Sequence, residues 1–288
     1  MRLHLIDGTF ELFRAHFSKR PDPGAGEPAK ATLGIVMSLL ALVNDPKEQV
    51  SHIAVAFDNP IRSFRNDLFA GYKTEEGVPP ELLAQFDAAE AAVRALGIVA
   101  WSMDRWEADD ALATAAFRFR DQVEQVRIMT PDKDLGQCLV GQRVVQVDRM
   151  RNREIDEAGL VALRGIAPAS IPDWLALTGD TADGVPGLAG FGEKTAAALL
   201  AKFEHLEGIP DDPARWPATV RGAARLARTL SESRAEATLY RSLTRLVTDV
   251  PLPETLDDLR WRGLAPGGMA EWRARFDREL GAPRHRIA

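Results

Sequence analysis

Acidic residues follow the ends of several short apolar runs in the first half of this chain. The run Arg2–Ile6 ends at Asp7 and the run His52–Phe57 ends at Asp58, and two later runs, at 97–101 and 126–130, are also followed by acids. Ligands of open α/β sheets bind beyond the carboxyl ends of the strands, so these carboxylates should converge on one place. Carboxylates that gather need a counter-charge, which a divalent metal ion supplies. The sequence therefore predicts a metal site at one edge of a sheet.

Helical patterns alternate with these runs, at about Ala31–Val43, Pro80–Leu96 and Trp106–Arg120. Such alternation is typical of a mainly parallel sheet with flanking helices, to which Gln142–Val147 adds a further strand. We therefore expect residues 1–150 to form an α/β domain.

The strand signals fade after about Arg149, and apolar residues then recur at helical spacing. Loops are expected at 208–216 and 250–254. Helices are expected at 155–163, 171–177, 194–203 and 220–230. Residues 151–288 are therefore predicted to form a mostly helical region.

The composition sets only broad limits on function. The 288 residues are 45% hydrophobic, enough for a sizeable core in one or two domains. The net charge of −6 is weak evidence against a polyanionic partner, because metal bound by clustered acids reverses the local field. Cys138 is the only cysteine, which excludes an internal disulfide and a cysteine zinc site. No signal peptide and no apolar stretch of about 20 residues is visible, so we expect a cytoplasmic protein without a membrane partner.

Each group of acids has a structural alternative when it is taken alone. The group at 107–110 opens a predicted helix and would suit helix capping equally well, and the pairs at 132–134 and 180–183 would suit turns. Their joint occurrence favours metal, because Mg²⁺ and Mn²⁺ prefer oxygen ligands and Mg²⁺ uses only a few carboxylates. So many acids suggest two ions, which about 3.5–4 Å apart can activate a water and stabilise the leaving oxygen of a phosphodiester. The predicted chemistry is phosphodiester hydrolysis.

A glycine-rich stretch, Gly184–Thr195, leads into a predicted helix. It does not match a nucleotide-binding P-loop, which needs a lysine directly after its last glycine, because Glu193 intervenes. A helical hairpin fits better, in which Gly190 and Gly192 let backbone amides approach a phosphate and Lys194 adds charge. A purely structural turn is the alternative.

Together these motifs resemble the 5′ nucleases, the family of flap endonucleases, bacteriophage 5′–3′ exonucleases and the 5′-nuclease domain of bacterial DNA polymerase I. The resemblance implies a PIN-like nuclease fold with a clamp or arch at about 59–80 and a helix–three-turn–helix DNA-binding element at 184–200. That element typically binds K⁺ through backbone carbonyls. The similarity covers nearly the whole chain, through Leu5–Gly8, Phe57–Asp58, Ser63–Arg65, Gly71–Lys73, Glu107–Asp110, Asp132–Asp134, Leu177–Asp180, Gly184–Gly187, Gly192–Thr195 and Val247–Leu252.

The resemblance also assigns roles to residues at matching motif positions. Lys73 and Arg65 would be catalytic, with Lys73 contacting the scissile phosphate; without the family match a solvated surface lysine would be the better interpretation. The implied metal ligands are Asp7, Asp58, Glu107, Asp109, Asp110, Asp132, Asp134, Asp180 and Asp183. The implied DNA-binding residues are Arg14, Arg62, Tyr72, Gly190, Gly192, Lys194 and Thr195. Aromatic stacking and phosphate contacts are the chemistry of the clamp, whereas a surface ion pair is the alternative for Arg14.

One position departs from the resemblance. Polymerase-type relatives carry an arginine three residues after the clamp lysine, where this chain has Glu76. The reversed charge should weaken steering of the 5′ strand unless Lys19 or Arg20 compensates. Arg221, Arg225 and Arg228 share a helical face that could track duplex phosphates, although such faces are more often merely solvated. Structural or surface roles are expected for the histidines, which show no metal-ligand spacing: His4, His16, His52, His205 and His285.

The expected function is a divalent-metal-dependent, structure-specific 5′ nuclease acting in replication and repair on DNA with a 5′ flap or a free 5′ end. The protein would be a monomer that uses two ions of Mg²⁺ or Mn²⁺, with K⁺ at the helix–three-turn–helix element. Two alternatives stay open. A PIN-type ribonuclease would share the acids but would not need residues 184–200, and a non-catalytic DNA-binding module would tolerate loss of the acids.

Overall fold

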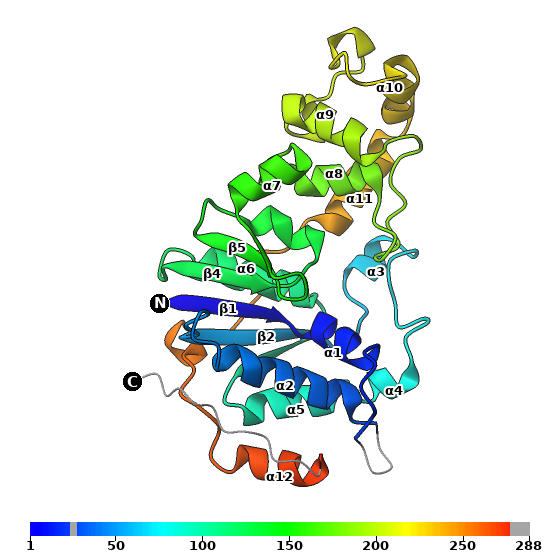
Figure 1. The fold of residues 1–288 in the computed structure, drawn as a ribbon. Coiled ribbons are helices and arrows are strands. Elements are labelled where there is room, and N and C mark those ends of the chain that lie inside the picture. Colours follow the sequence, from blue (N-terminus) through cyan, green and yellow to red (C-terminus); the bar gives the residue numbers. More distant parts are fainter. Residues whose placement is uncertain (24–27, 277–288) are drawn as a thin grey trace.

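A six-stranded sheet forms the centre of the structure, a computed structural model that describes residues 1–23 and 28–276 (Figure 1). The strand order is β3-β2-β1-β4-β5-β6, in which the first five strands are parallel and β6 runs antiparallel beside β5. The mainly parallel α/β fold is thus confirmed. The strands are β1 (Arg2–Asp7), β2 (His52–Asp58), β3 (Val99–Met103), β4 (Gln125–Met129), β5 (Val144–Asp148) and β6 (Arg153–Ile155).

Helices cover both faces of the sheet. One face packs on α2 (Lys30–Val43) and α5 (Phe86–Ala95), with α12 (Gly268–Arg275) packed against α5, and the other face packs on α6 (Ala108–Phe119) (Figure 1). Every residue of β2 is buried. The central strands read as continuous apolar runs because parallel strands covered on both faces have no side for polar residues.

The single helix predicted at 80–96 is wrong. The structure has a short helix α4 (Pro80–Leu83) and then α5, with the buried Gln85 at the break. The side-chain oxygen of Gln85 accepts hydrogen bonds from the backbone N–H groups of Ala31 and Thr32, at 2.9 and 3.1 Å. Since α2 has no side-chain cap of its own, Gln85 satisfies its first free donors. This contact between Gln85 and residues 53 and 54 positions earlier fixes the break between α4 and α5.

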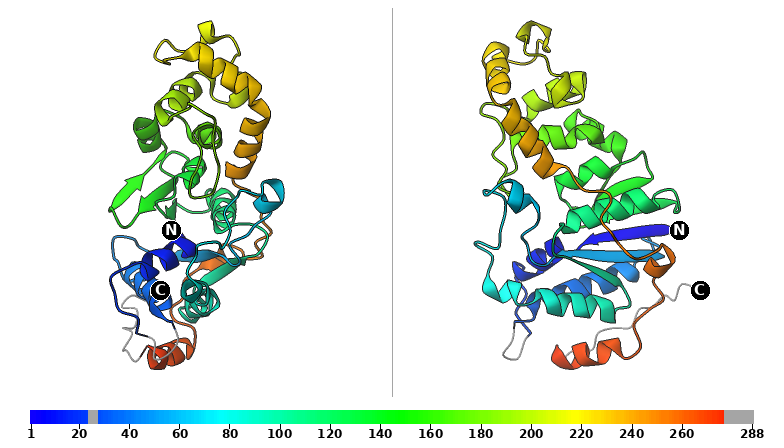
Figure 2. Two further views of the ribbon diagram at one scale, coloured as in Figure 1. Left: turned by 90° about the vertical axis from the view of Figure 1, so that its right-hand side faces the viewer. Right: turned by 180° about the vertical axis from the view of Figure 1, so that it is seen from behind.

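A stack of helices extends beyond the side of the sheet that β5 and β6 form (Figure 2). Four of them agree with the predicted helices: α7 (Glu157–Arg164), α8 (Ile171–Thr178), α9 (Glu193–Phe203) and α10 (Ala223–Glu232). The sequence reasoning missed α11 (Arg234–Thr244) and the short strand β6. Trp174, Leu199 and Leu226 belong to a hydrophobic core that this region forms apart from the sheet.

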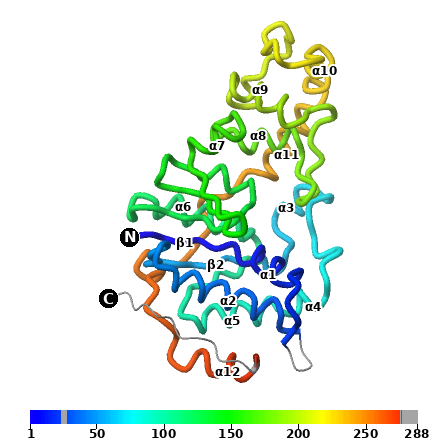
Figure 3. Tube along the Cα trace, in the orientation of Figure 1, coloured from blue at the N-terminus to red at the C-terminus, as the bar shows by residue number. Residues whose placement is uncertain are grey.

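The chain returns to the sheet after α11 (Figure 3). Leu246 and Leu252 pack with α6 in the core on one face, and Trp261 and Trp272 belong to the core on the opposite face. A single boundary near residue 150 therefore does not describe the packing, because residues 246–276 join the core of the first region. The last part of the predicted helical region, 277–288 with His285, lies outside the described residues.

Candidate metal centre

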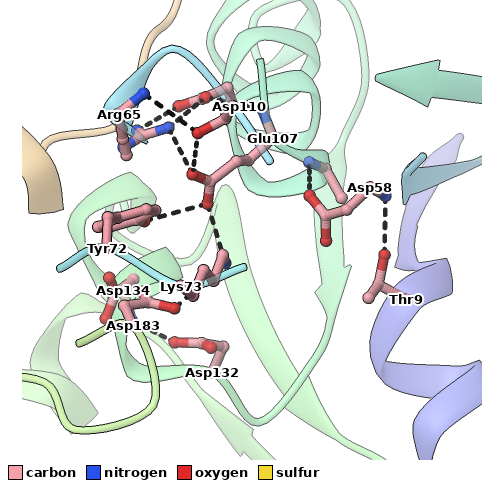
Figure 4. Close-up of polar contacts among 12 residues, drawn as sticks. Thr9, Asp58, Arg65, Tyr72, Lys73, Glu107, Asp110, Asp132, Asp134 and Asp183 are labelled. Atoms are coloured by element: carbon pink, nitrogen blue, oxygen red, sulfur yellow. Dashed lines mark hydrogen bonds and ion pairs between the residues drawn. The ribbon is translucent and has the colours of Figure 1, made fainter. Parts of the chain in front are cut away.

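The first acids stand at the carboxyl ends of neighbouring parallel strands. Asp7 ends β1, and its side chain accepts hydrogen bonds from Phe10 N at 2.8 Å and Thr130 Oγ1 at 3.0 Å. It is the N-cap of α1 (Gly8–His16), so the same carboxylate starts a helix and faces the site. Asp58 ends β2 and accepts from Ala108 N at 2.8 Å (Figure 4). The parallel pairing of β1 and β2 thus brings together acids 51 positions apart.

Glu107 and Lys73 form the contact that joins the clamp segment, residues 59–80, to the site (Figure 4). Lys73 Nζ lies 2.9 Å from Glu107 Oε2 and 3.1 Å from Asp183 Oδ1. The ammonium group therefore lies between two acids that come from distant parts of the chain. Ser63 Oγ donates to Glu107 Oε1 at 2.6 Å, which fixes the other oxygen of that carboxylate.

Arg65 and Asp110 form a buried ion pair, which bears on the catalytic and metal-binding roles predicted for them. Arg65 is 1% exposed and Asp110 is 0% exposed, and the guanidinium binds the carboxylate with two hydrogen bonds of 2.7 and 2.8 Å. Arg65 also donates to the carbonyl oxygens of Leu243 and Arg245, while Asp110 accepts from the backbone N–H groups of Glu107 and Val247. Through these partners Arg65 joins the clamp to the start of α6 and the end of α11, a position that favours a structural role over contact with a substrate. Both carboxylate oxygens of Asp110 already accept hydrogen bonds, which favours a structural role for it as well.

Tyr72 is also buried, with 4% exposure, and its hydroxyl donates to Glu107 Oε2 at 3.2 Å. At 4% exposure the ring leaves little surface for the predicted base stacking in this conformation. Ser63, Tyr72 and Lys73 together fix the orientation of Glu107. The sequence showed Tyr72 and Lys73 as adjacent clamp residues, but it could not show that both point inward.

The second group of acids comes from the loop after β4 and from the turn after α8. One carboxylate oxygen each of Asp134, Asp180 and Asp183 lies within 4.8 Å of the others. Asp134 Oδ1 is buried without a hydrogen-bond partner. A buried carboxylate oxygen without a donor is costly, so this group fits a bound cation. Lys133 Nζ lies 2.8 Å from Asp180 Oδ2 and supplies part of the missing positive charge.

Burial and mutual repulsion raise the pKa of most of these acids. Burial, together with the charges of Asp58 and Asp132, raises the pKa of Asp7 to about 7. Burial and neighbouring acids raise the pKa of Asp183 to about 6 and also raise those of Asp109 and Asp134. Burial acts on Glu107 in the same direction, but Lys73 and Arg65 outweigh it and hold its pKa at about 2. The site thus has more carboxylates than its own cations neutralise, which is the charge pattern that a divalent ion relieves.

Four of the acids line a cleft of about 470 Å³ that has an aromatic wall. Asp7, Asp58 and Asp132 line it from the ends of the strands and Asp109 from the start of α6, while Lys73, Thr74 and residues 76–79 line it from the clamp. On α1 and just beyond it, Phe10, Phe13 and Phe17 complete the wall, and Phe17 is 66% exposed. Sequence reasoning missed these rings, although their spacing of three and four places them on one helical face.

The remaining predicted DNA-binding residues lie outside this cleft. Arg14 on α1 pairs with the buried Glu11 and keeps about a third of its side chain exposed. Arg62 is exposed and lines a separate depression with Arg105. Lys19 and Arg20 are exposed just after Phe17.

The predicted helix–three-turn–helix element, residues 184–200, covers the turns after α8 and most of α9. Gly184 has φ of +73°, and a Cβ atom there would come within 2.2 Å of Gly71 O, so only glycine allows this turn to touch the clamp. Gly190, Gly192 and Lys194 are exposed and Thr195 is half-buried. Since α9 has no side-chain N-cap, its first N–H groups are available to an anion.

The first part of the chain, residues 2–164, matches the model of the 5′–3′ exonuclease N-terminal resolvase-like domain, and residues 166–266 match the 5′–3′ exonuclease C-terminal SAM fold. The chain belongs to the 5′–3′ exonuclease family. A relative called 5′–3′ exonuclease, from Aquifex aeolicus, is 31% identical over 90% of this chain and 86% of its own length. The DNA polymerase I of Pseudomonas aeruginosa is 35% identical over 89% of this chain, which spans only 28% of that polymerase. The predicted family is confirmed.

Solved structures of the 5′–3′ exonuclease type share the fold. A zinc-bound 5′-exonuclease of bacteriophage T5 superposes with a TM-score of 0.64 at 17% identity, covering 85% of this chain and 89% of the T5 chain. The catalytic core of Rad2, solved with a DNA substrate, gives a TM-score of 0.57 at 15% identity, covering 98% of this chain and 87% of that one. Within the described part of this family member, no single helix is long and apolar enough to cross a membrane, although the bent pair Glu157–Arg164 and Pro168–Thr178 meets the length and composition limits.

Proposed function

We propose that this 5′–3′ exonuclease family member is a divalent-metal-dependent, structure-specific 5′ nuclease that cleaves DNA at 5′ flaps and free 5′ ends. The observation that carries the proposal is the excess of converging carboxylates, with Asp134 Oδ1 buried and unpartnered among them. Seven of the nine predicted acids remain proposed ligands, Asp110 is withdrawn, and Glu107 is proposed to orient Lys73 instead. Two ions, Mg²⁺ or Mn²⁺, would when bound activate a water and stabilise the leaving oxygen.

The protein groups divide this work among themselves. Asp7, Asp58, Asp109 and Asp132 share the cleft and would hold one ion, whereas Asp134, Asp180 and Asp183 would hold the second. Lys73, which lines the cleft, would place its ammonium group against the scissile phosphate. Glu107 orients that ammonium group through Oε2, because Ser63 and Arg65 hold its other oxygen, Oε1.

DNA outside the cleft would be bound by separate elements. Lys194 and the N-terminus of α9 would hold a duplex phosphate, and K⁺ at the turns before α9 is proposed on the family resemblance alone. Arg225 adds positive charge to this surface, because its guanidinium lies close to Gly190: a Cβ atom built on that glycine would be 3.0 Å from it. Gly190, Gly192 and Thr195 would contribute backbone and hydroxyl donors, and Arg14 and Arg62 would bind phosphates. Monomeric action in the bacterial cytoplasm, at the nucleoid, is part of the same proposal.

The proposal is tested by cleavage of a 5′-end-labelled flap duplex by the purified protein with Mg²⁺ or Mn²⁺. Metal-dependent cutting near the flap junction that disappears with EDTA and with Asp132→Asn supports it. Comparable cutting of single-stranded RNA without flap preference would favour the ribonuclease alternative. Flap binding with no cutting in either metal would favour the non-catalytic DNA-binding module.

A further inference from the structure

A second, smaller pocket adjoins the acid cleft and carries the opposite charge. It has a volume of about 160 Å³, against about 470 Å³ for the cleft. Phe10 lines both, so one side chain of α1 separates them. Among the described residues that line this pocket, Arg14 and Arg149 are the cations and Glu11 is the one acid. We name it the arginine pocket.

The two arginines are held in place by groups that are themselves fixed. Glu11 is 3% exposed, is hydrogen-bonded by Arg14, and has Oε1 4.0 Å from Arg149 Nη1. Arg149 also donates from Nη1 to Ser38 Oγ at 2.8 Å and from Nη2 to Ser38 O at 3.2 Å. A guanidinium has five N–H donors, so Ser38 leaves several of those on Arg149 for a ligand. About a quarter of the Arg149 side chain and a third of the Arg14 side chain stay exposed.

The size and charge of the arginine pocket fit one phosphate group. Pockets for whole small molecules usually have volumes of about 300–1,000 Å³, well above this one. Arginine forks match the geometry of phosphate oxygens, and two cations facing one carboxylate leave a net positive charge. The neighbouring cleft has the opposite balance, so a DNA strand that enters it would be held by cations just outside.

We propose that Arg149, together with Arg14, binds a backbone phosphate of the DNA next to the acid cleft. The proposal rests on the function proposed above and adds to it a contact from the turn between β5 and β6. Ser38 and Glu11 are positioning residues for this contact.

The test compares Arg149→Gln with Arg143→Gln. Arg143 directly precedes β5 and Arg149 directly follows it, so the two substitutions remove the same charge from opposite ends of one strand. Arg143 is about half exposed and pairs only with Asp121 among the ion pairs of the described residues. Binding of a fluorescent flap duplex is measured by anisotropy in Ca²⁺ at several salt concentrations, with thermal unfolding as the check on folding.

Arg149→Gln should weaken binding about tenfold and make the slope of log K against log salt less steep by about 0.9, the value for one phosphate contact. Arg143→Gln should leave the slope unchanged, and Ser38→Ala should weaken binding by a smaller factor. An unchanged slope in Arg149→Gln, or an equal change in both arginine variants, would overturn the inference. Because these measurements need no cleavage, a protein that shows the Arg149 effect but never cuts would refute the nuclease proposal alone.

Discussion

The amino ends of the parallel strands form one edge of the sheet, the amino edge, and their carboxyl ends form the other, the carboxyl edge. Both edges contain buried charges, but the charges are balanced differently. At the amino edge, Arg127 lies 2.8 Å from Glu48 and 2.7 Å from Glu154, and His4 lies 3.1 Å from Glu48. Hydrogen bonding to His4 and the charge of Arg127 hold the pKa of Glu48 at about 2. At the carboxyl edge, by contrast, the pKa of Asp7 is raised to about 7.

This difference separates structural charges from functional ones. A buried acid with a matched cation is satisfied within the chain, and its lowered pKa records that stabilisation. An acid with a raised pKa that lies beside other acids has no matching cation in the chain, so its partner must come from outside. The amino edge therefore holds the sheet together, and the carboxyl edge is arranged to receive cations.

The largest expected effect is on catalysis and separates the two edges. Asp134→Asn should lower the rate of flap cleavage by about a thousandfold or more, since a metal ion contributes several kcal/mol to such reactions. Glu48→Gln should change the rate by less than about threefold, because it lies at the opposite edge. Single-turnover rates at saturating Mn²⁺ measure both, and similar losses in the two variants would remove the distinction between the edges.

The reverse contrast is expected for stability. Glu48→Ala leaves the half-exposed Glu154 as the one acidic partner of Arg127 among the described residues, and breaking such a buried pair should cost roughly 3 kcal/mol of unfolding free energy. Glu154→Ala, which removes the exposed partner of the same arginine, should cost under about 1 kcal/mol. Urea unfolding of the metal-free variants gives both values. Equal costs would show that Glu48 is not the central acid of this network.

The raised pKa values predict how stability depends on pH. Asp7 and Asp183 have folded pKa values of about 7 and about 6, above the ordinary value. Such groups bind a proton more tightly in the folded state, so they favour folding at low pH and this contribution is lost as pH rises from about 4 to about 7. The Tm of the metal-free protein should fall between pH 5 and pH 7.5 more than that of Asp7→Asn. Mn²⁺ should raise Tm more at pH 7.5 than at pH 5, and a pH-independent metal effect would contradict this assignment.

Lys133 should act as a weak competitor of the metal. Its ammonium lies 2.8 Å from Asp180 and is one-third exposed, so the pair is worth under about 1 kcal/mol. Lys133→Gln should therefore tighten Mn²⁺ binding by up to about fivefold, measured by electron paramagnetic resonance of free Mn²⁺. Lys202→Gln, on the helical region, is the matched control. Weaker binding in Lys133→Gln would mean that this lysine supports the ion.

The smallest expected effect concerns the clamp residue at which this chain departs from its relatives. Glu76 lines the acid cleft, so Glu76→Arg should add about one phosphate contact and steepen the salt slope of flap binding by about 0.9. Glu75→Arg is not a suitable control, because Glu75 accepts hydrogen bonds from Ile61 and Arg62 within the clamp. An unchanged slope would place Glu76 away from the strand path.

The sheet and the acids could be predicted from sequence because their signals are local. An apolar run followed by an acid reports a strand end, and parallel pairing then brings Asp7 and Asp58 together without further information. The partnership of Arg65 with Asp110 could not be predicted in this way. It joins residues 45 positions apart, and the same two side chains would look equally suited to catalysis on an exposed surface.

Long-range packing explains the other errors. Gln85 breaks a helix because it caps α2, and no pattern within 80–96 reveals that contact. The return of residues 246–276 to the sheet depends on hydrophobic surfaces left open by distant elements. Phe10, Phe13 and Phe17, in contrast, could have been found from their spacing and their place directly after Asp7.

The most direct test of the central claim is calorimetric titration of the metal-free protein with Mn²⁺ at pH 7.5. The proposed function predicts two bound ions per chain, with Asp134→Asn losing one of them and Glu48→Gln losing neither. No bound ion, or the same number in wild type and Asp134→Asn, would contradict the proposal that the acids at the carboxyl edge form a two-metal centre.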